Sequence, residues 1–563
     1  MTRAMSVSLS QQVVSTLLGA LVLVACASPA TVIPAGGGVG VGASAMTAEP
    51  RELTADQQVA HVLNRLAYGA RPGDAERVRA IGVDRWIERQ LAPERIDDAA
   101  TARFIERAYP TIARATAELL RESAPPVPPA RPPRAAADSG MAPALDTAGR
   151  ARARRTAQRT LGELQSAKLA RAVTSERQLE EVMVDFWENH FSVFAGKGPV
   201  RYFLPEYTRE AIRPHALGKF RTLLGAVAAS PAMLFYLDNW QSGADSGRPV
   251  LGPRRVAARR RAGLNENYAR ELLELHTLGV DGGYTQHDVI EVARAFTGWS
   301  IEQPRSSGEF IFRPILHDAS EKTVLGVRLR PGRGIEDGRQ VLDIVAAHPA
   351  TARHIARKLT VRFVSDDPPE ALVERAAATF TRTGGDIREV VRTIVTSPEF
   401  FSRAAWRAKV KSPFEVVASA LRVMGADADP TPRAAQLVAR LGQPLYLRET
   451  PDGWPETGAE WINAGAILNR INFGLMVGAG RAPGVALERW PPARTLVRAP
   501  REAQVDGVIA ALFDGEASPD TRSILVSGES PMHRETPDTP RRRLDGLPLV
   551  IGLALGAPEF QRR

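Results

Sequence analysis

Residues that could do chemistry gather in one short stretch of the chain, from Asn265 to Leu278. On a helix that turns by about 100° per residue, one arc of this stretch carries mostly ionisable side chains: Glu266, Asn267, Arg270, Glu271 and Glu274. The glutamates could act as acid, base or metal ligands, and Arg270 could hold an anionic group. Glu266, Arg270 and Glu274 are also spaced like the weak ion pairs of a solvated helix face, worth about 0.3–0.5 kcal/mol each. The sequence leaves both interpretations open.

Two histidines lie on otherwise apolar helix faces. His276 shares its face with Ala269 and Leu272, and His190 lies on the apolar face of a helix predicted for residues 175–191. A buried imidazole must satisfy both ring nitrogens, so each is either a hydrogen-bonded core residue or a base or metal ligand. If the two helices met, the two imidazoles would come together, which would favour chemistry. The sequence does not place them.

A third candidate is the pair His317-Asp318, in a predicted loop. The flanking segments 310–312 and 323–326 are rich in β-branched and aromatic residues and predict a small β-hairpin. An ordinary turn would account for the pair equally well.

Two helices must position the first stretch. The helix from Asn265 to Leu278 is followed by a Gly-rich turn, and Thr285 caps the next helix with Asp288 three residues on, which predicts an αα-hairpin. A calcium loop that starts at Asp281 is rejected, because Val292 falls where the last carboxylate of such a loop is needed.

Helical patterns also dominate the rest of the chain from Thr54 onward. Ser175 and Gln178 form a predicted capping box, four more helices are expected within residues 336–400, and the apolar run 547–555 predicts a short buried helix. The expected fold is mainly α: a multi-helix globular array of αα-hairpins with at most a small β-hairpin near residues 308–328.

Charge and cysteine content narrow the function classes. The 563 residues carry a formal charge of +10, which suits an anionic partner such as an envelope surface. No helix combines a basic stripe with interleaved aromatics, so nucleic acid is not expected as a partner. The one cysteine, Cys26, excludes disulfides within the chain and a zinc site built on several cysteines.

The position of Cys26 predicts where the protein resides. Arg3 and an apolar run from Val13 to Ala25, too short to span a membrane, have the layout of a signal peptide. The last four residues, Leu23-Val24-Ala25-Cys26, resemble the lipobox of bacterial lipoproteins. That resemblance implies a lipidated Cys26 as the mature N-terminus, and Ala27 after it favours the outer over the inner membrane.

The predicted organisation has three parts. Residues 1–26 are the lipoprotein signal peptide, residues 27–50 are a flexible tether rich in Ala, Gly, Ser and Pro, and residues 51–563 form the helical domain. A Pro/Ala/Arg-rich segment at 124–155 is predicted to be a disordered insertion, and it could instead serve as a basic arm that grips an envelope polymer.

Several motifs resemble one bacterial family, catalogued as domain of unknown function 1800. They span the chain in order from residue 54 to 563: HVLNRLAYGARPGD, QLEEVMVDFWENHF, NENYARELLELHTLGVDGGYTQ, ARAFTGW, the His317-Asp318 region, HPATARHIARKL, TGGDIREVVRTIVTSPEF, KSPFEVVASALR and the closing PEFQ. The insertion 124–155 departs from the family. The resemblance implies no activity or catalytic residue. By gene neighbourhood it implies an association with a secreted family of unknown function, numbered 1501.

Two functions follow from the sequence. The first is a lipid-anchored envelope protein that binds a protein or polymer without chemistry. The second is an envelope enzyme, in one form a metal-dependent hydrolase, with His190 and His276 as bases or ligands, the glutamates near them, and His317-Asp318 at the same site. No cofactor or metal can be named, because known catalytic fingerprints are missing from the sequence.

Overall fold

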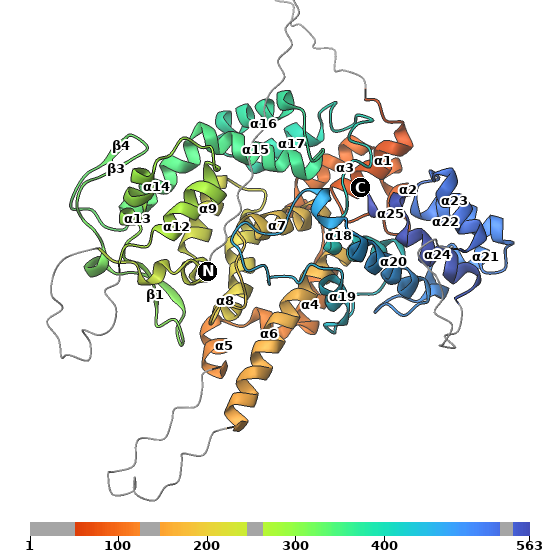
Figure 1. Ribbon diagram of the computed structural model, residues 1–563, viewed down its shortest axis with the longest axis horizontal. Helices are drawn as coiled ribbons and strands as arrows, with labels where there is room; N and C mark the ends of the chain where they lie inside the picture. Colours follow the sequence, from red (N-terminus) through yellow and green to blue (C-terminus); the bar gives the residue numbers. More distant parts are fainter. Residues whose placement is uncertain (1–50, 124–146, 245–262, 530–543) are drawn as a thin grey trace, which may run out of the picture. The chain divides into compact units, whose positions relative to one another are not determined.

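The computed structural model describes residues 51–123, 147–244, 263–529 and 544–563, and Figure 1 shows their arrangement. This part of the chain is mainly helical, as predicted. The predicted signal peptide, Cys26 and the tether lie outside the described residues. So do residues 124–146 of the predicted insertion. Residues 147–155, predicted to be disordered, are instead the first turns of a long helix.

The first half of the chain holds twelve α- and π-helical segments among its described residues. They are α1 Ala55–Arg65, α2 Asp74–Ile81, α3 Val83–Gln90, α4 Ala99–Ala108, α5 Thr116–Ser123, α6 Thr147–Thr174, α7 Gln178–His190, α8 Val200–Glu206, η4 Tyr207–Ile212, α9 Phe220–Ala229, α10 Pro231–Tyr236 and α12 Glu266–Glu271. Of these, η4 is a π-helix.

The second half continues with a π-helix, η7 Leu272–Thr277, and further α-helices. These are α13 Gln286–Ala295, α14 Glu336–Ala347, α15 Pro349–Phe363, α16 Glu370–Arg382, α17 Ile387–Val395, α18 Pro413–Val423, α19 Arg433–Arg440, α20 Ala464–Gly478, α21 Ala493–Leu496, α22 Arg501–Leu512, α23 Pro519–Ser527, α24 Gly546–Gly556 and α25 Pro558–Gln561. Short 3₁₀ turns are η1 Pro93–Arg95, η2 Pro110–Ala113, η5 Arg213–His215, η6 Asn239–Gln241, η8 Pro314–Leu316, η9 Gly458–Trp461 and η10 Leu487–Arg489. None of the helices in the described residues is long and apolar enough to cross a membrane.

The strands form two antiparallel hairpins instead of the predicted one. Strand β1 (Trp299–Glu302) pairs with β2 (Glu309–Phe312), with Trp299 opposite Phe312. Strand β3 (Lys322–Val324) pairs with β4 (Val327–Leu329), with Val324 opposite Val327. The predicted pairing of 310–312 with 323–326 is therefore wrong. Each segment pairs with a closer strand in the sequence, across residues 303–308 and 325–326, and the shorter loops cost less loop entropy.

Helix α7 lies among other helices and is buried on two faces (Figure 1). Its apolar face includes Trp187, whose indole N–H donates to the carbonyl of Ala216 over 2.9 Å. The predicted capping box of Ser175 and Gln178 does not form. The helix begins at Gln178, and the carboxylate of Asp98 accepts from the Ser175 hydroxyl and from the backbone N–H of Glu176 instead.

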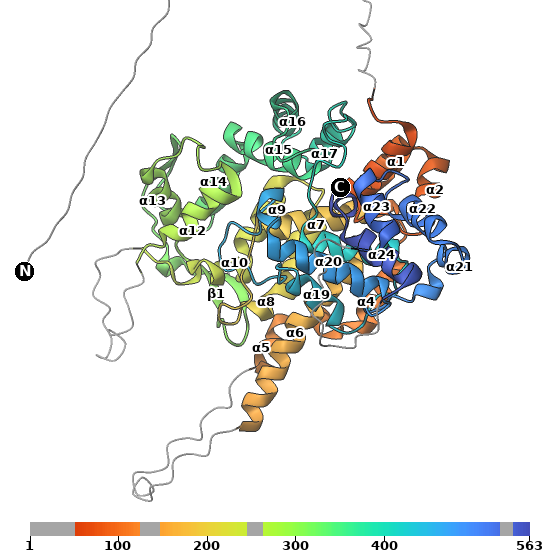
Figure 2. The same ribbon diagram turned by 45° about the vertical axis from the view of Figure 1, so that its right-hand side comes forward.

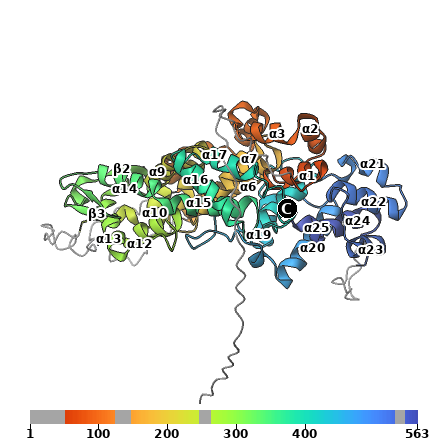
Figure 3. The same ribbon diagram turned by 90° about the horizontal axis from the view of Figure 1, so that it is seen from above.

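Helices α20 and α24 pack at glycines and lie side by side in Figure 2. A Cβ added to Gly478 would lie 2.3 Å from the carbonyl oxygen of Pro548, and one added to Gly474 would lie 2.5 Å from that of Gly552. Only glycine allows two backbones to approach so closely. Helices α15, α16 and α17 form another packed group, which Figure 3 shows from above.

The N-terminal helices are held by residues far along the chain. Two buried arginines make the links. Arg65 on α1 donates to the carbonyls of Phe363, over 3.2 Å, and Ala405. Arg422 on α18 donates to the carbonyl of Gly69 over 2.7 Å and to the carboxylate of Asp74 over 2.9 Å.

Candidate functional site

The acidic arc lies on the pair of helices α12 and α13, which is called the central hairpin from here on. The arc is half-exposed and hydrogen-bonded. Asn265, predicted as the first residue of the helix, instead caps α12 and accepts from the N–H groups of residues 267 and 268. Gln286, at the start of α13, donates to Glu266 over 2.7 Å and accepts from Arg270 over 2.8 Å. The Tyr284 hydroxyl donates to Glu274 over 3.1 Å. The arc therefore connects α12 and η7 to α13 and to Tyr284 just before it.

Glu271, in the same arc, has a shifted pKa. It is half-buried. Burial, followed by repulsion from Glu274, raises its pKa. Its carboxyl therefore takes up a proton more readily than an ordinary surface glutamate does.

The two predicted histidines do meet. The Nε2–H of His190 donates to the carbonyl oxygen of His276 over 3.1 Å, and the ring centroids are 6.2 Å apart. The ring of His354, on α15, is also 6.2 Å from that of His190. The helix predicted through residue 278 becomes the π-helix η7 at Leu272, and this wider turn carries His276 into the core.

These three histidines are held neutral. Burial, followed by the charge of Lys358, lowers the pKa of His276 to about 3 and that of His354 to about 4. The same causes lower the pKa of His190 well below its usual range. One nitrogen of each ring has no hydrogen-bond partner among the described residues: His190 Nδ1, His276 Nε2 and His354 Nε2. Aromatic rings surround the cluster, with Phe191 4.5 Å from His190 between centroids.

Metal binding by this cluster finds no support in the geometry. Within the described ranges, no three His, Cys, Asp or Glu side chains are grouped so that they could hold a metal ion. The contact between His190 and His276 is from ring to main chain. Two glutamates of the predicted site, Glu266 and Glu274, accept hydrogen bonds from Gln286 and Tyr284 within the α12–α13 hairpin.

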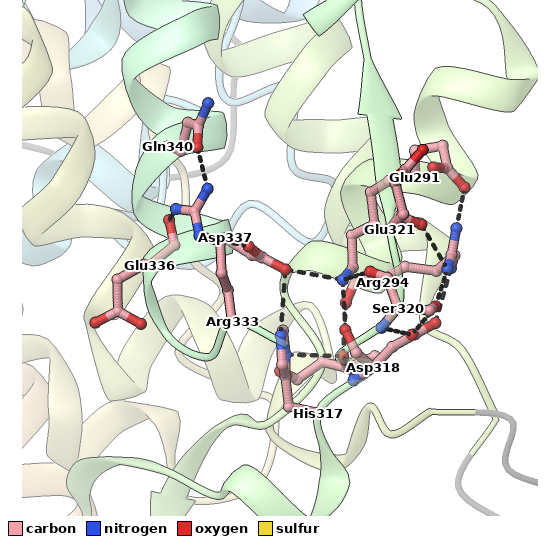
Figure 4. A network of polar contacts seen from close by, with 12 residues as sticks. Glu291, Arg294, His317, Asp318, Ser320, Glu321, Arg333, Glu336, Asp337 and Gln340 are labelled. Carbon is pink, nitrogen blue, oxygen red and sulfur yellow. Dashed lines mark hydrogen bonds and ion pairs between the residues drawn. The ribbon is translucent and has the colours of Figure 1, made fainter. Parts of the chain in front are cut away.

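The pair His317-Asp318 belongs to a separate network, drawn in Figure 4. The Nδ1–H of His317 donates to the carbonyl of Thr297 over 2.8 Å, and its Nε2 lies 3.4 Å from Asp337. Asp337 also pairs with the buried ammonium of Lys322 over 2.8 Å. Burial opposes the charge of Asp318, but hydrogen bonds from Arg294 and Ser320 hold its pKa well below the usual range.

This network joins several elements of the fold. Arg294 on α13 binds Asp318 over 2.8 Å and Glu291 over 2.5 Å, and Glu291 accepts from the backbone N–H of Thr323 over 2.7 Å. The network thus ties α13 to the β3–β4 hairpin, and through Asp337 to α14. The structure does not bring His317 or Asp318 to the histidine cluster by any contact among its described residues.

The second buried face of α7 carries charged residues that the sequence analysis did not single out. Glu181, Asp185 and Glu188 follow one another at helical spacing. Lys168 on α6 lies 2.8 Å from both Asp185 and Glu188. Arg213 binds Glu181 through two hydrogen bonds of 2.8 Å. The sequence does carry a signal for these residues, because they form an acidic i, i+4, i+7 row on the side of the helix opposite its apolar face.

Glu188 has the fullest set of partners in this group. Besides Lys168, it accepts from the Thr208 hydroxyl over 2.6 Å and from the Tyr446 hydroxyl over 3.1 Å. Arg362 on α15 reaches Asp185 over 3.0 Å. The cations and hydroxyls around these carboxylates offset the cost of burying them.

These charges form the floor of a cavity of about 200 Å³ between α4, α6, α7 and η4. Its wall is mostly apolar and includes Ile105, Tyr109, Ile112, Leu164 and Val184. Arg171, half-buried on α6, also lines it. A mostly apolar pocket with a few convergent polar groups is the usual form of a ligand site, and the π-helix η4 at its edge is a feature common near functional sites.

The molecule is thus a helical protein with a cavity beside helix α7 that has both charged and apolar lining residues. The chain belongs to the family described as "Protein of unknown function (DUF1800)", which matches residues 61–562. This match confirms the resemblance found in the sequence motifs. No curated protein and no solved structure matches the chain.

Proposed function

We propose that this is a lipid-anchored protein of the bacterial cell envelope that binds a ligand or partner without catalysing a reaction. The observation that carries the location is that the only cysteine, Cys26, ends the sequence Leu23-Val24-Ala25-Cys26 behind an apolar run. Several acyl chains on this cysteine would anchor the protein stably. Ala27 favours the outer membrane.

Binding is favoured over chemistry by the state of the charged groups. The carboxylates of α7 are neutralised by neighbouring cations, and the acidic arc of the central hairpin is bonded to α13. The three clustered histidines are neutral and lie among aromatic rings. The cavity beside α7 is the binding site favoured by its shape and lining. A secreted protein of the gene-neighbour family numbered 1501 is the proposed protein partner.

The test uses the full chain expressed in a Gram-negative host with a labelled fatty acid. We expect the label on the wild type, in the outer-membrane fraction, and its loss in Cys26→Ser. Ala27→Asp is the matched control: it should keep the label and move to the inner membrane. Label on Cys26→Ser, or an unlabelled wild type, would overturn the proposed anchor.

A further inference from the structure

We propose that the cavity between α4, α6, α7 and η4 binds an amphipathic anion, whose carboxylate or phosphate head pairs with Arg171 and whose hydrocarbon part lies along the apolar wall. The proposal rests on the proposed binding function and names the ligand class for that site.

Arg171 supplies the first argument. Its guanidinium lines the cavity, and the described residues give it no hydrogen bond or ion pair. Burial, followed by repulsion from Arg213, lowers its pKa. Glu181 attracts Arg171 but is already bound by Arg213 through both oxygens. A half-buried guanidinium without an ion pair is stabilised by an anion that enters the cavity and binds it.

The other cations of the cavity lining are already paired. Lys168 and Arg213 pair with carboxylates of α7, and Arg209 lies 2.9 Å from Glu210. Arg171 is the cation of this lining that forms no ion pair with a described residue. Glu180 and Asp98 act on Arg171 only from a distance, without an ion pair. A guanidinium binds a carboxylate or phosphate through two parallel hydrogen bonds, so either head suits the position.

The wall supplies the second argument. Ile105, Ile112, Leu164 and Val184 would remain in contact with water if the cavity held only an inorganic anion. Each methylene moved from water to such a wall strengthens binding by about fourfold. A volume of about 200 Å³ takes one short chain and no folded partner. An acyl chain with an acidic head fits both the wall and Arg171.

The test uses the purified full chain in lipid nanodiscs, with empty nanodiscs subtracted. The probes are radiolabelled decanoate and decyl phosphate, with decanol and acetate as partial probes. We expect saturable binding of decanoate, decyl phosphate or both, and weaker binding of decanol and acetate. The two anions separate a carboxylate head from a phosphate head.

Three variants decide the outcome. Arg171→Gln should weaken binding of the anions about tenfold or more and leave decanol binding unchanged. Arg155→Gln, which changes an exposed arginine on the same helix, should bind like the wild type. Ala113→Trp adds bulk at an exposed position lining the cavity, leaves Arg171 intact, and should weaken every probe that uses the wall. The unfolding midpoint of each variant checks that it is folded.

The proposal fails if decanol binds as tightly as decanoate, if folded Arg171→Gln binds the anions like the wild type, or if no probe binds saturably. These results are independent of the anchor. A chain lipidated at Cys26 that binds no probe loses only the ligand, and a chain without lipid that binds decanoate loses only the envelope location.

Discussion

The surroundings of several buried residues in this protein determine whether their side chains are charged or neutral. The imidazoles of His190, His276 and His354 lie against aromatic rings and near the ammonium of Lys358, so the core admits them only without a proton. The buried carboxylates of α7 have cations beside them. Burial disfavours charge at both places, so the imidazoles lose their protons and the carboxylates need neighbouring cations.

The neutral histidines make stability depend on pH. The pKa of His276 is about 3 in the folded protein against 6.5 in the unfolded chain, so only the unfolded chain is protonated between these values. The contribution of His276 to the free energy of unfolding is therefore full above pH 6.5 and falls by about 1.4 kcal/mol per pH unit below it. Urea unfolding at pH 7 and pH 5 measures this fall.

The variant His276→Gln should lose less stability than the wild type over the same pH interval. His287→Gln, at an exposed histidine on α13, is the control and should follow the wild type. A His276→Gln protein with an undiminished pH dependence would contradict the assignment of a buried neutral ring.

At the residue scale, the sequence predicted some contacts and missed others for definable reasons. Periodicity placed His190 and His276 on inward faces, and both are buried. It could not predict that His354 would join them from a third helix, because helix packing is not encoded in the period of one helix. In the sequence, Arg171 and the acidic row of α7 look like an ordinary solvated helix face. Their burial depends on neighbouring helices, which the sequence pattern of one helix does not predict.

Among the elements, the pair α20–α24 depends most directly on small residues. The backbones meet at Gly474, Gly478 and Gly552, where no side chain fits. We expect Gly478→Ala to force the helices apart and to lower the free energy of unfolding by about 1–3 kcal/mol. Thermal or urea unfolding measures the change.

Gly465→Ala on the same helix is the matched control. This glycine is exposed in the first turn of α20, and its added Cβ would lie 3.5 Å from the nearest atom. Alanine there should leave stability unchanged or raise it by about 0.5–1 kcal/mol. Equal losses at Gly465 and Gly478 would refute the close-packing argument.

Element types were predictable and element details were not. Helical periodicity and the cap at Thr285 identified real helices. The π-helix η7 was not predicted, because one inserted residue scarcely changes the spacing of apolar residues over a single turn. The capping box at Ser175 failed because Asp98, from a distant segment, competes for the same donors.

At the scale of the whole molecule, Arg422 joins three distant parts of the chain. Its guanidinium binds Asp74, the carbonyl of Gly69 and the carbonyl of Val173. Replacing it by methionine removes these bonds and leaves Asp74, which is 4% exposed, with weaker compensation. We expect Arg422→Met to lower the free energy of unfolding by about 3–5 kcal/mol.

Hydrogen exchange would locate the effect of Arg422→Met. The amides of α1–α3 should lose more protection than those of α13 or α14. Arg440→Met, at an exposed arginine on α19, is the control and should change neither stability nor protection. Uniform loss of protection, without preference for the N-terminal helices, would show that Arg422 does not hold them.

The attachment of the first helices to α18 has a consequence for the order in which the chain is made. Arg422 and Gly69 are 353 positions apart, so α1–α3 leave the ribosome long before their partner exists. Contacts of such separation slow folding, because the intervening chain must first be closed into a loop. The early segments therefore lack this contact through most of synthesis. A chain that has not completed its fold is also what a secretion channel can thread, so this architecture is compatible with the export that we propose.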